Sequence, residues 1–104
     1  MKANYKNKTM DYFKDMLKNT IPFQEGQKVK LDIKQIKSHP DYSIKTEKYR
    51  NWIEKNQDKI FTVEYDKDKS INPKYQVCLK EDVTKPKWLF WTGELIEVSD
   101  DGRN

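Results

Sequence analysis

The clearest pattern in the chain is an alternation of apolar and charged residues between positions 28 and 34. Val29, Leu31 and Ile33 are the apolar members of the stretch Lys28-Val29-Lys30-Leu31-Asp32-Ile33-Lys34. Successive side chains of a β-strand point to opposite faces, so this spacing predicts a strand with its three apolar residues facing the core. Gly26 marks the point where we expect the strand to begin.

Four more stretches predict short strands. Residues 60–65 and 75–79 alternate between apolar and polar positions. Residues 88–91 are apolar on both faces, and residues 95–98 form a last short strand after the turn Thr92-Gly93-Glu94. Five short strands separated by closely spaced turns predict a small antiparallel barrel.

Residues 9–19 have the spacing of a short amphipathic helix. Met10, Phe13 and Leu17 recur on one face, and Thr9 can cap the N-terminus. We expect this face to pack over one end of the β structure.

A second helix is predicted at about residues 46–56, between the first and second strands. Thr46 is a suitable N-cap, and Tyr49, Trp52 and Ile53 fall on one face. The sequence therefore predicts a mainly β protein, with about five antiparallel strands and peripheral helices.

Composition changes the expected nature of the core. Thirteen of the 104 residues are aromatic (three Trp, six Tyr and four Phe), while 37% of the chain is charged. Because aliphatic residues are few, the core is expected to depend on aromatic side chains. The length suits one domain over residues 1–104, in which residues 99–104 are a polar tail that we expect to be flexible.

The order of these segments resembles an SH3-like barrel. The resemblance covers residues 26–98, and its last part is the stretch Trp88-Leu89-Phe90-Trp91-Thr92-Gly93-Glu94-Leu95-Ile96-Glu97-Val98. This stretch is similar to the closing strand, one-turn 3₁₀ helix and final strand of that fold. More narrowly, the chain resembles small uncharacterised proteins of Gram-positive bacteria and their mobile elements.

The resemblance implies a side-chain phase for the last two strands. It places Phe90 inside, with Ile96 and Val98 inward on the next strand. Trp91 and Leu95 then fall where the peptide-binding relatives have groove residues.

Trp91, Leu95 and Tyr75 are therefore the candidate interaction surface for a protein or peptide. The alternative is that the helix at 9–19 covers Trp91 and Leu95 and makes them ordinary core.

Several classes of protein and site are not expected. The longest apolar run has four residues, too few for a membrane-spanning helix, and the start MKANYK lacks the apolar segment of a secretory signal. One cysteine, Cys78, and one histidine, His39, form neither an intramolecular disulfide nor a zinc-ligand set. We expect a cytoplasmic, monomeric protein without a cofactor, a metal or a membrane partner.

Little in the sequence indicates catalysis. Cys78 lies in a predicted strand and His39 in a loop, with no pattern that joins them as nucleophile and base. Asp66, Asp68 and Ser70 occupy the first ligand positions of a calcium loop, but the required glycine and glutamate are missing. Among the carboxylates, only Glu94 and Glu97, beside the tryptophan-rich strand, are expected to have a raised pKa. We do not expect an enzyme.

The charge distribution suggests an alternative function. Residues 1–60 carry 14 basic and 8 acidic side chains, whereas residues 61–104 carry 7 basic and 9 acidic ones. Lys28, Lys30 and Lys34 could contact phosphate groups without reading base sequence, or they could simply keep the protein in solution. The sequence thus favours a non-enzymatic protein-interaction module of unknown partner. A nucleic-acid-associated accessory protein that binds the phosphate backbone non-specifically is the alternative.

Overall fold

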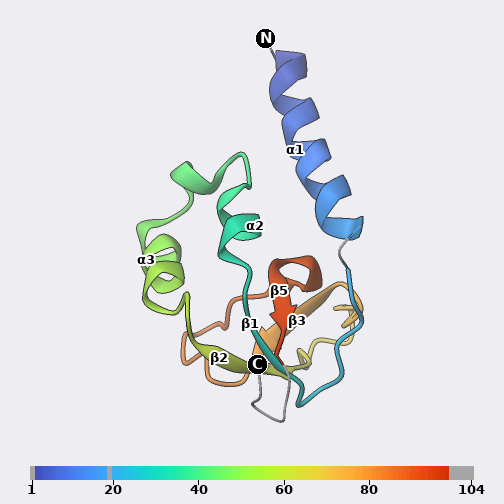
Figure 1. Ribbon diagram of the computed structural model, residues 1–104, viewed down its shortest axis with the longest axis vertical. Helices are drawn as coiled ribbons and strands as arrows, with labels where there is room; N and C mark the ends of the chain where they lie inside the picture. The colour runs from blue at the N-terminus through green and yellow to red at the C-terminus, as the bar shows by residue number, and fades with distance from the viewer. Residues whose placement is uncertain (1, 19, 99–104) are drawn as a thin grey trace.

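The computed structural model describes residues 2–18 and 20–98 (Figure 1). The elements in chain order are α1 (Lys2–Lys18), β1 (Lys28–Leu31), α2 (Ile33–Lys37), the 3₁₀ turn η1 (Tyr42–Ile44), α3 (Glu47–Lys55), β2 (Ile60–Glu64), β3 (Gln76–Leu79), β4 (Phe90–Trp91), the 3₁₀ turn η2 (Thr92–Glu94) and β5 (Leu95–Glu97). The predicted set of short strands with peripheral helices is confirmed. The predicted tail, residues 99–104, lies outside the described residues.

The five strands form one antiparallel sheet in the order β4-β3-β2-β1-β5. Within it, β1 pairs with β2 on one side and with β5 on the other, so that Val29 lies opposite Phe61 and Glu97. Across the described residues, no pairing between β4 and β5 joins the two edges. The closed barrel that the sequence predicted is therefore not confirmed, while the antiparallel five-stranded sheet is.

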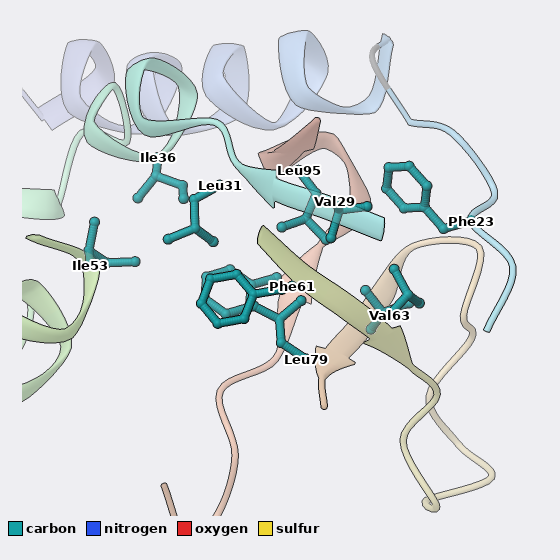
Figure 2. Packing of buried hydrophobic residues seen from close by; sticks show 11 residues of the cluster. Phe23, Val29, Leu31, Ile36, Ile53, Phe61, Val63, Leu79 and Leu95 are labelled. Carbon is teal, nitrogen blue, oxygen red and sulfur yellow. The ribbon is translucent and has the colours of Figure 1, made fainter. Parts of the chain in front are cut away.

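The core lies between one face of the sheet and the helices α2 and α3 (Figure 2). Trp52 of α3 stacks on Phe61 with 5.6 Å between ring centroids and lies 5.7 Å from the ring of Phe90. Aromatic side chains thus contribute to the core, as the composition predicted. The buried cluster consists of Phe23, Val29, Leu31, Ile36, Ile53, Phe61, Val63, Val77, Leu79, Phe90 and Leu95.

The first strand is shorter than predicted, and a helix that the sequence analysis missed follows it directly. Val29 and Leu31 point into the core as expected, but β1 ends at Leu31. Asp32 then caps α2, because its Oδ1 accepts a hydrogen bond from the backbone N–H of Gln35 at 3.1 Å. Ile33 therefore packs against the core from the first turn of a helix and not from a strand.

The predicted second helix is confirmed as α3. Thr46 is its N-cap, with Oγ1 accepting a hydrogen bond from the backbone N–H of Tyr49 at 3.3 Å. Ile53 of this helix is completely buried.

The predicted phase of the last strand was wrong. Leu95 is only 5% exposed and belongs to the core, whereas Ile96 is 39% exposed. The turn η2 reorients the chain between β4 and β5, so the alternation on one strand is not carried across to the next. Leu31 of β1 lies opposite Leu95, which places both on the buried face.

The helix α1 packs on η2 with a different face from the one predicted. It begins at Lys2, and Figure 1 shows its N-terminal part extending away from the rest of the molecule. Among residues 10–18 of this helix, Tyr12 and Met16 are buried, while Met10 and Leu17 are exposed. None of the described helices is long and apolar enough to span a membrane.

Gly93 allows the close approach of α1 to η2. A Cβ atom at this position would lie 2.7 Å from Cγ of Met16 and would also collide with the Met16 carbonyl oxygen. Only glycine fits at this contact without displacement of the helix.

Candidate functional site

A cleft of about 510 Å³ beside η2 brings together side chains from every helical part of the fold. We call it the aromatic cleft, because four half-buried aromatic rings line it, from Phe13, Tyr49, Trp88 and Trp91. The complete lining is Phe13, Ile36, His39, Ile44, Lys45, Thr46, Tyr49, Trp88, Leu89, Trp91 and Glu94.

Packing between distant segments positions the four rings. The ring of Phe13 meets that of Trp91 edge to face at 5.7 Å, and Tyr49 meets Trp88 in the same way at 5.2 Å. The backbone N–H of Trp88 donates to Oδ2 of the buried Asp82 at 2.9 Å, which fixes the chain just before β4. The aromatic cleft is thus built on anchored elements.

Glu94 provides a buried carboxylate in the aromatic cleft. Its side chain is 6% exposed; Oε2 accepts a hydrogen bond from the Tyr12 hydroxyl at 2.7 Å and Oε1 accepts one from the backbone N–H of Trp91 at 3.1 Å. Burial raises the pKa of Glu94, and these two hydrogen bonds and the charge of Lys45 partly oppose that rise. The raised pKa of Glu94 agrees with the expectation from the sequence, and Glu97 is exposed on β5.

Two tyrosines near this carboxylate remain neutral. Burial, and then the charge of Glu94, raise the pKa of Tyr12, so its hydroxyl stays a hydrogen-bond donor. Burial and the same charge also raise the pKa of Tyr49.

His39 and Lys45 complete the polar part of the aromatic cleft. Nδ1 of His39 accepts a hydrogen bond from the backbone N–H of Asp41 at 3.0 Å; burial and then the charge of Lys45 lower the pKa of this histidine. The imidazole is therefore neutral near pH 7. The Lys45 ammonium group lies 5.7 Å from the centroid of the Tyr49 ring.

The three residues of the predicted interaction surface do not lie together. Trp91 lines the aromatic cleft, where Phe13 of α1 partly covers it. Leu95 is in the core, and Tyr75, 37% exposed, is not part of the lining; its ring lies 5.5 Å from the Lys74 ammonium group. Of the three helix residues expected to cover Trp91 and Leu95, Phe13 contacts Trp91, whereas Met10 and Leu17 are exposed.

The three predicted phosphate-binding lysines are also divided. Lys28 and Lys30 are exposed on the outer face of β1, opposite the core-facing Val29 and Leu31. Lys34 lies on α2, which packs on the core side of the sheet. The Lys28 ammonium group donates to Oγ1 of Thr62 at 2.7 Å, and that hydroxyl also bonds to the carboxylate of Glu81.

The residues considered for catalysis or metal binding lie apart. Cys78 lines a cavity with Glu64 and Lys87, on a different part of the surface from His39, and burial raises the pKa of its thiol. Asp68 closes a local turn by accepting hydrogen bonds from the N–H and hydroxyl of Ser70. Within residues 2–18 and 20–98, no group of three His, Cys, Asp or Glu side chains could hold a metal ion.

Sequence reasoning found Trp91 and marked Glu94, but it missed Tyr49, Trp88 and Lys45 as members of one site. Lys45 and Tyr49 lie just before and within the first turn of α3, whereas Trp88 precedes β4, and the helical spacing only placed Tyr49 on one face with Trp52 and Ile53. No local pattern could reveal that α1, α3 and η2 converge. Comparisons of the chain with protein-family models, curated proteins and solved structures give no match.

Proposed function

We propose that this chain is a non-enzymatic interaction module that binds a partner polypeptide in the aromatic cleft. The observation that carries the proposal is the group of four half-buried rings around a cavity of about 510 Å³. Aromatic side chains in an open cleft are typical of binding surfaces, and this volume is within the usual range for binding sites.

Exposed apolar residues at the aromatic cleft support a polypeptide partner. Ile44 is 78% exposed and Leu89 is 37% exposed, and both belong to the lining. A partner that covered them would remove apolar surface from water, which favours association.

We also propose that the fold is an SH3-like arrangement. Two features support it: the strand order β4-β3-β2-β1-β5, and the position of the 3₁₀ turn η2 between β4 and β5. In this interpretation α1 is an addition to the fold, and it forms one wall of the aromatic cleft through Phe13.

A binding role suits the chemistry of the cleft better than catalysis. Hydrogen bonds from Tyr12 and from the backbone N–H of Trp91 hold the Glu94 carboxylate in a fixed orientation, which suits binding. Cys78 and His39 line different cavities, so they do not form a nucleophile–base pair.

Peptide selection on the full chain, followed by chemical-shift mapping, tests the proposal. Selected peptides should shift the indole signals of Trp88 and Trp91. Ile44→Asp places a charge on an exposed apolar position of the aromatic cleft and should abolish binding. Val83→Asp is the matched control, because Val83 is 86% exposed and lies outside the lining. Equal binding by both variants would contradict the proposal.

A further inference from the structure

We infer that the aromatic cleft binds a lysine or arginine side chain of the partner, with the cationic group between the Tyr49 ring and the Glu94 carboxylate. The inference rests on the proposed function and specifies the chemistry of the residue that enters the cleft.

Glu94 supplies a negative charge that can attract a cationic group. Glu94 is the sole acidic side chain among the described residues that line the aromatic cleft. Each of its oxygens accepts one hydrogen bond from the chain, which orients the carboxylate and leaves a second lone pair on each oxygen. A cationic donor can therefore bind without breaking the contacts to Tyr12 and Trp91.

Aromatic rings line the same cavity as that charge. The faces of tyrosine and tryptophan rings attract ammonium and guanidinium groups, and the attraction grows when water is excluded. The rings of Tyr49 and Trp88 are half-buried, pack edge to face, and line the same cavity as Glu94. The neutral imidazole of His39 adds no positive charge to oppose a cation.

The aromatic cleft already holds a cation of its own. The Lys45 ammonium group lies over the Tyr49 ring, 5.7 Å from its centroid, and its charge acts on Glu94. This intramolecular contact has the chemistry that we assign to the partner. Lys45 would thus occupy the site in the free protein and be displaced on binding.

The local structure allows this displacement. The Lys45 carbonyl oxygen accepts a hydrogen bond from Nε of Arg50 at 3.0 Å, which holds the backbone of the loop. The side chain has a long flexible stem, so the ammonium group can move to solvent while the main chain stays in place. Exposed Ile44 and Leu89 would then contact apolar residues beside the cationic residue of the partner.

A peptide series tests the inference on the full chain. The probes are acetyl-Leu-X-Leu-amide peptides in which X is lysine, arginine, norleucine or citrulline, titrated to millimolar concentration and followed by backbone and indole chemical shifts. We expect the cationic peptides to bind about tenfold more tightly than their neutral counterparts, the size of one partly desolvated cation–aromatic and ion-pair contact.

Two variants and one control locate the effect. Glu94→Gln should remove the preference for lysine over norleucine. Lys45→Met should tighten binding of the cationic peptides several-fold, because it removes the resident cation; Lys45 is half-buried and is not part of the hydrophobic core. Lys48→Met, on the exposed side of α3 and outside the lining, should change nothing.

The outcomes separate the two proposals. Equal binding of neutral and cationic peptides, with shifts at the aromatic cleft, would overturn the cation inference and leave the proposed function standing. Weaker binding by Lys45→Met would also overturn it, since Lys45 would then contact the ligand. If no peptide of the series shifts a cleft signal at millimolar concentration, both proposals fail.

Discussion

Burial gives Glu94 a protonation equilibrium that differs between the folded and unfolded chain. Its pKa in the folded state is raised above the ordinary value of 4.5. As pH rises past 4.5, the unfolded chain loses this proton first, while the folded chain retains it. The stabilisation linked to the raised pKa of Glu94 is therefore complete below pH 4.5, and it is lost as pH rises through the folded-state pKa.

We predict that Glu94→Gln removes this part of the pH dependence. The free energy of unfolding of the variant, relative to the native chain, should increase as pH rises from about 4 to 7. Urea unfolding at several pH values measures it, and Glu97→Gln, on an exposed neighbour, is the control. Parallel stability curves for the native chain and the Glu94 variant would show that burial does not affect this group.

At the scale of elements, the orientation of β5 determines which of its side chains contribute to the free energy of unfolding. Leu95→Ala creates a cavity in the core and should cost about 2–5 kcal/mol of unfolding free energy. Ile96→Ala, on the exposed face of the same strand, should change stability by less than about 0.5 kcal/mol. Denaturant unfolding of the two variants tests which side chains of β5 face the core. A larger loss of unfolding free energy in Ile96→Ala than in Leu95→Ala would favour the orientation implied by the SH3-like resemblance.

The contact between α1 and η2 is the second element-scale feature with a testable energy. Gly93→Ala forces a methyl group against the backbone of Met16 and should destabilise the protein by about 1–3 kcal/mol through overpacking. Hydrogen exchange should increase in the part of α1 that contains Tyr12 and Met16.

A second substitution shows whether the helix itself is displaced. Tyr12→Phe leaves Oε2 of Glu94 without its donor and should cost about 1–3 kcal/mol on its own. If Gly93→Ala moves α1 away, the two costs should be less than additive, because the hydrogen bond is already lost. Simple additivity would mean that η2 adjusts while the helix stays in place.

At the scale of the whole molecule, the three lysines predicted to bind phosphate do not share one surface. Lys28 bonds to Thr62 beside Glu81, and Lys34 lies on a different side of the sheet from Lys28 and Lys30. We therefore expect the substitutions Lys28→Gln, Lys30→Gln and Lys34→Gln to leave the salt dependence of oligonucleotide affinity almost unchanged. Titrations between 50 and 200 mM salt measure it, and a loss of roughly one unit of slope per lysine would instead support phosphate-backbone binding.

The sequence by itself determined those elements whose signals are local. The alternation at Val29 and Leu31 identified β1, Thr46 identified the start of α3, and the turn Thr92-Gly93-Glu94 identified η2. Each signal depends on residues within one turn or strand, where backbone geometry fixes the spacing of side chains. The missed helix α2 shows the limit, since the cap at Asp32 prevailed over the continued alternation at Ile33.

Only the tertiary structure decided which apolar residues became core and which became cleft. Leu95 is buried because β5 pairs with β1, and Trp91 is half-buried with the ring of Phe13 from α1 against it. Glu94 meets Tyr12 across 82 positions of sequence. Contacts at that separation leave no periodicity in the chain, so the aromatic cleft exists only where the helices and η2 meet.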